Sequence, residues 1–342
     1  MASVVMADDG IAFDGATAEK GPLGGAETAF VALAEALAAR GHHVEARSRC
    51  AGRLRHREVN WAPIDRGVPE TCDLYIGNRG HRLIGLVPRP RRRLLWLHNP
   101  ALYLRKPRMA ARIAWYRPLI VTTGTYHATT VPSWLRDGGR TVIPYGVLDR
   151  FRHAEPRMPP PPRAVFTSNP LRGLDWLIDL WIERIRPAVP NAELHIYAVT
   201  AVYGGANKHA AEINAVLARA DTLADEGIHR HAPVGREQLV ELLYGARAML
   251  YRGDVGETFC LALAEAQALG VPAIVTPLGA VGERVANNVS GRVAESDDAF
   301  VEAAIAVLRD DELWRRWHMG ALNSQRGLSW DEVAERYEAL IP

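Results

Sequence analysis

The chain has 342 residues, of which 48% are hydrophobic, and this length suits two domains of ordinary size. It contains no run of 18 apolar residues, and its first residues lack the basic start and long apolar core of a signal peptide. Three scattered cysteines suit neither a disulfide framework nor a zinc site, so we expect a cytoplasmic protein.

The small net charge of +2 conceals an uneven distribution of charge along the chain. Residues 1–157 carry 24 Lys and Arg against 14 Asp and Glu, whereas residues 158–342 carry 17 against 25. The segment 74–136 contains twelve Lys and Arg and no acidic residue. Such a basic half predicts an anionic partner, which can be a phospholipid surface, a phosphorylated acceptor or a nucleic acid.

The start of the chain has the pattern of a Rossmann-like unit. Residues 3–7 predict a strand, a glycine-containing loop ends at 21–27, residues 26–40 have the apolar spacing of a helix, and a second strand begins at Val44. Gly24 and Gly25 lack a Cβ, so a ligand can approach their backbone closely. The alternative is a plain turn that precedes a helix.

Two more strands are predicted in this half, at 73–77 and 94–97, and the second one ends in His98. Ligands of open parallel sheets bind at the carboxyl ends of the strands, so His98 is a candidate site residue. A lone histidine often has only a structural role, and this alternative stays open.

Basic residues alternate with aromatic and apolar residues around that strand, between positions 89 and 117. This pattern fits a basic amphipathic surface on anionic lipid headgroups. The simpler alternative is a set of solvated arginines around ordinary core residues. Nucleic-acid binding is the third interpretation. We find no nucleic-acid motif, so we expect no nucleic acid among the partners.

Four consecutive prolines at 159–162 predict a stiff linker. We therefore place the domain boundary after residue 155, with an N-terminal domain at 1–155 and a second domain at 156–327. Strands predicted at 164–167, 193–199, 228–234 and 248–251 alternate with helices. This alternation predicts a second Rossmann-like domain and hence an α/β protein with a central cleft.

The stretch 254–276 carries the most specific pattern in the chain, a loop, an Ala- and Leu-rich helix and a short strand. Glu257 precedes the helix, and Glu265 lies about two turns into it and leans back toward its start. Between the two acids lie the positive end of the helix dipole and free backbone N–H groups near Phe259, Cys260 and Leu261. This arrangement predicts a site for a diphosphate with hydroxyl-bearing rings on either side.

The stretch resembles the retaining glycosyltransferases of group 1, family 4-like, which have a Glu-x7-Glu motif and the GT-B fold. The resemblance covers both acids, Phe259 and the run Glu-Ala-Gln-Ala-Leu-Gly-Val-Pro. It departs at Cys260, where the family often has glycine. It implies transfer of a sugar from a UDP-sugar or GDP-sugar, without a metal or cofactor. The acceptor stays unidentified: a glycan, a glycolipid or another lipid-linked or anionic molecule.

The resemblance also implies roles for individual residues. Glu257 would hold hydroxyls of the donor sugar, Glu265 would hold the ribose, and Arg172, which precedes a glycine, would contact the diphosphate. His98 would lie close to the donor sugar. The other donor-binding positions implied are Gly24, Gly25, Val234, Thr258, Phe259, Cys260 and Leu261.

Two further implications of the resemblance concern a loop of the second domain and the last helix of the chain. Residues 278–285 are similar to the family's Gly-rich loop before an acidic residue. The family's final helix, here within 328–342, often crosses back onto the first domain.

A peripheral position on the inner membrane face is compatible with the basic half. Two other functions stay open: an inactive nucleotide-sugar-binding partner of a larger complex, and a sugar-nucleotide epimerase of the same fold.

Overall fold

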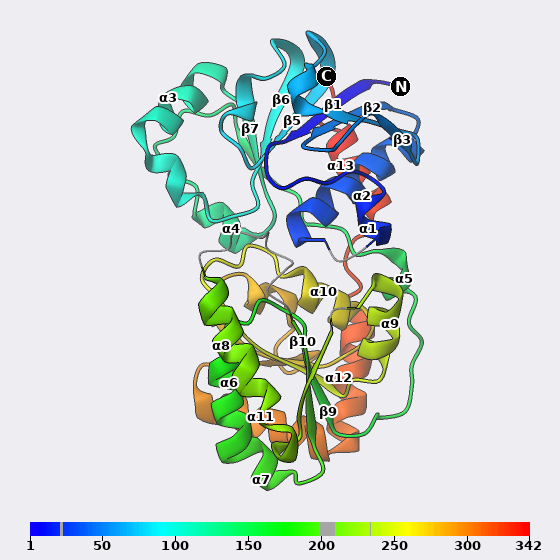
Figure 1. The fold of residues 1–342 in the computed structure, drawn as a ribbon, viewed down its shortest axis with the longest axis vertical. Helices are drawn as coiled ribbons and strands as arrows, with labels where there is room; N and C mark the ends of the chain where they lie inside the picture. The colour runs from blue at the N-terminus through cyan, green and yellow to red at the C-terminus, as the bar shows by residue number, and fades with distance from the viewer. Residues whose placement is uncertain (21–22, 199–208, 233) are drawn as a thin grey trace. The chain divides into compact units, whose positions relative to one another are not determined.

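The computed structural model describes residues 1–20, 23–198, 209–232 and 234–342. The chain forms two compact units, one made of Met1–Gly146 with Leu328–Pro342 and the other of Val147–Gly327. Each unit is built around a largely parallel sheet with helices on its faces (Figure 1). The predicted fold class, two Rossmann-like α/β domains, is thereby confirmed.

The first unit contains an eight-stranded sheet in the order β3-β4-β2-β1-β5-β6-β7-β8. All neighbours pair in parallel except β3 and β4, which are antiparallel. The central strand β1 is buried because it pairs with β2 on one side and β5 on the other. The strands are β1 (Ser3–Asp8), β2 (His43–Ser48), β3 (Leu54–His56), β4 (Val59–Pro63), β5 (Thr71–Asn78), β6 (Arg89–Trp96), β7 (Leu119–Thr122) and β8 (Arg140–Val142).

Strand β6 begins earlier than the sequence predicts. The arginines at 89–93, expected before the strand, belong to it because the long neighbour β5 offers backbone partners from Thr71 onward. The guanidinium of Arg93 lies over the ring of Tyr116, at 5.0 Å from its centroid. Part of this basic run therefore belongs to the sheet and packs against a ring of the same unit.

The helices of the first unit are α1 (Thr17–Lys20), α2 (Gly25–Ala39), α3 (Pro107–Tyr116), α4 (Thr125–Thr129) and α13 (Trp330–Glu338), with 3-10 turns η1 (Ile64–Arg66), η2 (Leu83–Gly85) and η3 (Ala101–Arg105). Helix α13 lies beside α2, as Figure 1 shows. Its N-cap Ser329 and Glu332 form a reciprocal capping box. Arg40, at the end of α2, pairs with Glu338 at 2.7 Å, and this contact ties the C-terminal segment to the first unit.

The second unit contains six parallel strands in the order β11-β10-β9-β12-β13-β14. Helices α6, α8 and α11 lie on one side of this sheet and α9, α10 and α12 on the other (Figure 1). Such a doubly covered parallel sheet explains the continuous apolar runs of its strands. The strands are β9 (Arg163–Phe166), β10 (Glu193–Tyr197), β11 (Ile228–His231), β12 (Ala248–Gly253), β13 (Ala273–Leu278) and β14 (Gly291–Val293).

The helices of this unit are α5 (Asp149–Arg152), α6 (Leu174–Leu180), α7 (Arg186–Ala188), α8 (Ala210–Asp221), α9 (Arg236–Tyr244), α10 (Leu261–Ala268), α11 (Asp297–Arg309) and α12 (Asp311–Ser324), with shorter turns η4 (Trp181–Ile185), η6 (Ala224–Glu226) and η7 (Val281–Arg284). A turn expected at 203–205 and the start of a helix expected at 208 lie outside the described residues. The strands expected at 193–199 and 228–234 are shorter than predicted.

The boundary between the units lies after Gly146 and not after residue 155. The intervening segment is bound to the second unit, because α5 buries Phe151 completely and packs against α10. Arg326 donates to the carbonyl of Ala154 at 2.7 Å, and Arg247 donates to the carbonyl of Pro160 at 3.0 Å. The proline run is therefore fixed against the second unit over part of its length.

Candidate active site

The loop that leads from β12 into α10 places two buried carboxylates around the start of the helix. Glu257 and Glu265 are 6% and 4% exposed. The loop is held by its own backbone, since the N–H of Glu257 donates to the carbonyl of Asp254 at 2.9 Å. The carbonyl of Glu257 in turn accepts from the N–H of Ala280 at 3.0 Å. Glu257 thus lies on a hydrogen-bonded turn before the helix, and Glu265 lies within the helix.

The N-cap of α10 is Cys260, whose backbone is left-handed, with φ of 66°. This conformation costs little for glycine and more for a residue with a Cβ, so Cys260 holds a strained backbone at the helix start. Burial and the charge of Glu257 raise the pKa of the Cys260 thiol well above its usual value. The thiol is therefore neutral and inert, and the contribution of this position is its backbone.

Arg172 lies next to Glu257, as the sequence predicts for two groups of one site. The residue after it, Gly173, has φ of 92° and packs so closely on Arg252 that a Cβ would collide with that side chain. Arg172 Nη1 forms an ion pair with Glu257 Oε1. The same carboxylate oxygen accepts a hydrogen bond from the hydroxyl of Tyr251 at 2.8 Å, and Ser168 donates to that hydroxyl at 3.1 Å.

The remaining predicted positions of this unit lie around the same edge of the sheet. Thr258 and Phe259 are buried just before α10, and Leu261 is its first residue. Val234 follows the end of β11, directly before Gly235, the N-cap of α9. All six strands are parallel, so the carboxyl ends of β9, β11 and β12 meet at one edge, where ligands of such sheets bind.

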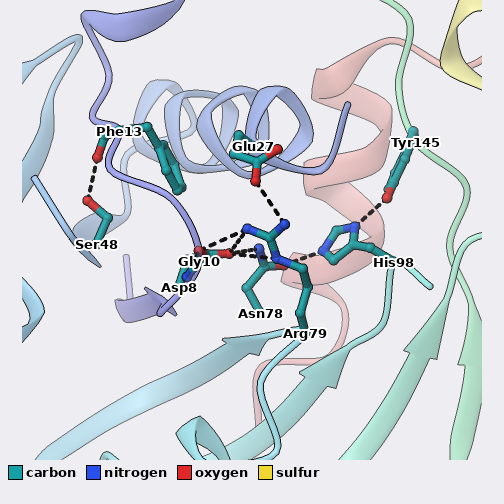
Figure 2. Close-up of polar contacts among 9 residues, drawn as sticks. All are labelled: Asp8, Gly10, Phe13, Glu27, Ser48, Asn78, Arg79, His98 and Tyr145. Atoms are coloured by element: carbon teal, nitrogen blue, oxygen red, sulfur yellow. Dashed lines mark hydrogen bonds and ion pairs between the residues drawn. The ribbon is translucent and has the colours of Figure 1, made fainter. Parts of the chain in front are cut away.

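The first unit carries a separate polar cluster at the carboxyl ends of β1, β5 and β6 (Figure 2). Arg79, which follows β5, donates to Asp8 at 2.7 Å and forms an ion pair with Glu27 of α2 at 2.8 Å. Asn78 donates its amide to Asp8. Ring nitrogens of His98 contact the amide oxygen of Asn78 and the hydroxyl of Tyr145.

This network assigns the protonation of His98. Because the amide nitrogen of Asn78 donates to Asp8, its oxygen must accept, so Nε2 of His98 carries the proton and Nδ1 accepts from Tyr145. Burial and the nearby charge of Arg79 lower the pKa of His98 well below its ordinary value. His98 is a neutral imidazole with both nitrogens engaged, so its role near a donor sugar stays a prediction.

Gly24 and Gly25 lie beside this cluster at the start of α2. Gly24 is the N-cap, without a side-chain cap, and a Cβ there would collide with the carboxylate of Glu27. A Cβ on Gly25 would meet no atom within 4 Å, so its backbone is open to a ligand. Sequence reasoning did not select Asp8, Glu27 or Tyr145, although Asp8 directly follows the strand predicted at 3–7 and Glu27 lies two residues after the glycine pair.

In the described ranges, no three His, Cys, Asp or Glu side chains gather in a way that would hold a metal ion. Among the same residues, no helix is both long and apolar enough to cross a bilayer.

The fold is that of a two-domain α/β protein of the GT-B class. Residues 161–310 match the family model of glycosyl transferases group 1, and this segment contains Arg172, Val234, Glu257 and Glu265. The chain is also similar to the D-inositol 3-phosphate glycosyltransferase of Xylanimonas cellulosilytica, with 33% identity over 106 residues. D-inositol 3-phosphate glycosyltransferase 1 of Catenulispora acidiphila is 30% identical over 99 residues.

These sequence matches cover 30% and 28% of this chain and about a quarter of each relative, 25% and 24%. Solved structures resemble the whole chain. Sucrose-phosphate synthase from Thermosynechococcus elongatus superposes with a TM-score of 0.75 at 14% identity, covering 99% of this chain and 98% of that one. HepE of Anabaena, in complex with UDP-glucose, gives 0.70 at 14% identity, covering 99% of both chains. At such identities the likeness establishes the fold.

Proposed function

We propose that this chain is a glycosyltransferase that transfers a sugar from a UDP-sugar or GDP-sugar to an acceptor with retention of anomeric configuration. The observation that carries the proposal is the pairing of Arg172 with Glu257 at the start of α10, inside the segment that matches the glycosyl transferases group 1 model. The similar protein HepE, described in complex with UDP-glucose, supports a nucleotide-sugar donor.

In this proposal the diphosphate lies on the backbone N–H groups that begin α10, where the helix dipole favours negative charge. Arg172 then exchanges its pairing with Glu257 for phosphate oxygens, which its planar guanidinium can bind in a forked manner. Negative charge develops on the departing diphosphate during transfer, so this contact strengthens in the transition state.

The two carboxylates would recognise the parts of the donor on either side of the diphosphate. Glu257, released in part from Arg172, accepts hydroxyl groups of the sugar, and Glu265 accepts those of the ribose. The bond from the anomeric carbon to the diphosphate breaks and a bond to the acceptor oxygen forms on the same face. The acceptor proton leaves with the phosphate, so no protein thiol or imidazole need serve as a base.

The first unit would receive the acceptor beside the open backbone of Gly25 and the cluster around Arg79. We propose a glycan, glycolipid or other lipid-linked acceptor. An epimerase of the same fold would bind the same donors but would release no glycoside, and an inactive binding partner would release no nucleoside diphosphate. The intact trio of Arg172, Glu257 and Glu265 supports the transferase over the inactive partner.

We further propose that the surface around α3 rests on an anionic membrane. Large apolar side chains are exposed there, with Trp115 at 81% and Leu102 at 51%. The basic residues 105, 106 and 108, from the end of η3 to the start of α3, are exposed in the same segment. Exposed tryptophan among basic residues suits the headgroup region of a bilayer, where apolar and cationic groups both gain contacts.

The donor proposal is tested by thermal shift with UDP, GDP and their sugars. We expect one of the two bases to raise the melting temperature and Glu265→Ala to reduce that rise. An assay of released nucleoside diphosphate, with NMR of the product anomer, then tests transfer and retention. Failure of every nucleotide to stabilise the chain would overturn the proposal.

The membrane proposal is tested by sedimentation with vesicles of phosphatidylglycerol and phosphatidylcholine. We expect binding only to the anionic vesicles and a clear loss of binding in Trp115→Ser. Equal binding of this variant, or indifference to lipid charge, would contradict the proposal.

A further inference from the structure

Arg284 ends η7, on the connection between β13 and β14, and its guanidinium lies over Phe259. The distance from its central carbon to the ring centroid is 4.5 Å. The connection that carries it is fixed to the Glu257 loop, because Ala280 donates to the carbonyl of Glu257 at 3.0 Å. At Gly279 the two segments approach so closely that a Cβ would collide with the backbone of Asp254. Arg284 is therefore held against the loop that carries Glu257.

The charge of Arg284 is poorly compensated in the free protein. Its side chain is only 20% exposed, and the carboxylate of its chain neighbour Glu283 lies 3.6 Å away, beyond hydrogen-bond length. In the described part of the chain, its buried Nε has no hydrogen-bond partner. Burial lowers the pKa of this guanidinium. A largely desolvated cation whose ion-pair partner lies beyond hydrogen-bond length destabilises the free protein, and an anionic ligand would offset that cost.

The position of this charge relates it to the start of α10. The charges of Arg172 and Arg284 both act on the Cys260 thiol and lower its pKa, against the larger opposite effect of burial. Two guanidinium groups, from the β9–α6 loop and from η7, lie near the helix N-cap, because Arg172 pairs with Glu257 and Arg284 lies over Phe259. Arg172 has Glu257 as an ion-pair partner there. Arg284 adds positive charge beside the amide groups that the proposed function assigns to the diphosphate.

We propose that Arg284 is a second cationic donor-binding residue, which binds an oxyanion of the nucleotide sugar next to the start of α10. This inference rests on the proposed function. The oxyanion has two possible sources, a phosphate of the nucleoside diphosphate or a carboxylate on the transferred sugar. Both are planar or forked acceptors that a guanidinium binds with two hydrogen bonds.

The test measures dissociation constants by calorimetry for the whole chain and four variants, of which Arg172→Met is the reference for loss of the proposed diphosphate contact. Arg284→Met removes the charge but keeps an apolar chain over Phe259, Arg284→Lys keeps the charge, and Arg292→Met is the matched control. Arg292 lies on β14 and is bonded to Asn288 at 2.7 Å. The probes are the nucleoside diphosphate that binds the wild type, its neutral nucleoside, and its hexose and hexuronate sugars.

We expect Arg284→Met to weaken binding of the nucleoside diphosphate about tenfold or more, the usual effect of losing a hydrogen bond to a charged group. The affinity of Arg284→Lys for the diphosphate should lie between those of the wild type and Arg284→Met. Arg292→Met should bind the diphosphate as the wild type does, and Arg284→Met should bind the neutral nucleoside as the wild type does. A loss confined to the hexuronate sugar would also support the inference and would assign the carboxylate as the ligand. Unchanged affinity of Arg284→Met for the diphosphate and for both sugars would overturn it.

The outcome distinguishes this inference from the proposed function. If the wild type binds no nucleotide, the proposed function fails. If the wild type binds and Arg172→Met loses affinity, while Arg284→Met keeps wild-type affinity for the diphosphate and for both sugars, only the role of Arg284 fails. Should Arg284→Met not fold, Arg284→Lys decides: a threefold or greater loss of affinity supports the inference, and wild-type affinity contradicts it.

Discussion

Replacing Tyr251 with phenylalanine tests whether Glu257 is held by its neighbours. Tyr251 is completely buried, and its hydroxyl donates to Glu257 at 2.8 Å and accepts from Ser168 at 3.1 Å. A hydrogen bond to a charged group contributes about 1.5–3 kcal/mol. Glu257 keeps its ion pair with Arg172, so we take about 2 kcal/mol as the loss in free energy of unfolding.

For a unit of this size, 1 kcal/mol corresponds to about 2–4 °C, so Tyr251→Phe should lower the melting temperature of the second unit by about 4–8 °C in scanning calorimetry. The effect of Tyr251→Phe on binding affinity should differ between the nucleotide sugar and the nucleoside diphosphate. Affinity for the nucleotide sugar should fall several-fold, since Glu257 is less well oriented, while affinity for the nucleoside diphosphate should not. Tyr197→Phe, on β10 of the same sheet, is the control. A melting temperature equal to that of the wild type, or equal losses for both ligands, would refute this reasoning.

Three further outcomes follow from the structure. Burial lowers the pKa of His127 to about 4, so below the unfolded value of 6.5 the unfolded state binds more protons and the free energy of unfolding falls. His127→Gln should remove about 2 kcal/mol of the stability that the wild type loses between pH 7.5 and 5 in urea unfolding. A pH dependence of stability equal to that of the wild type would count against this account. Cys260→Gly should leave the free energy of unfolding in urea within about 1 kcal/mol of the wild type, because relief of the left-handed backbone offsets the lost thiol and the greater chain entropy. The β-branched variant Cys260→Val should lower this free energy by more than that. Equal stability of the two variants would contradict this reasoning. Arg172→Met should reduce both donor affinity and kcat, with the larger effect on kcat/KM, and unchanged steady-state kinetics would exclude the assigned role.

The sequence predicted the second unit better than the first. The Glu-x7-Glu stretch combines a helix start, two acids and a terminating Gly-Pro pair, so local chemistry alone places Glu257 and Glu265. The nearby ion pair with Arg172 follows from parallel strand order, because the loops after β9 and β12 emerge at adjacent strands of one edge. The side-chain partners Tyr251 and Ser168 were not predicted, since each lies inside an apolar or turn segment that carries no signal of its own.

The polar cluster of the first unit shows what sequence patterns cannot provide. Asp8, Asn78 and His98 come from three strands that are far apart in the chain, and only the order β1-β5-β6 makes them neighbours. The short strands β3 and β4 were missed because their alternation is too brief to separate from a loop. The boundary after Gly146 depends on tertiary packing of Phe151, whereas the proline run marked only local stiffness.

The most direct measurement is a crystal structure of the chain soaked with the nucleotide sugar that stabilises it. Our account predicts phosphate oxygens within hydrogen-bond reach of the backbone N–H groups at the start of α10, with Arg172 on the diphosphate and Glu265 on the ribose. A nucleotide bound elsewhere, or a helix start closed by its own side chains, would contradict it.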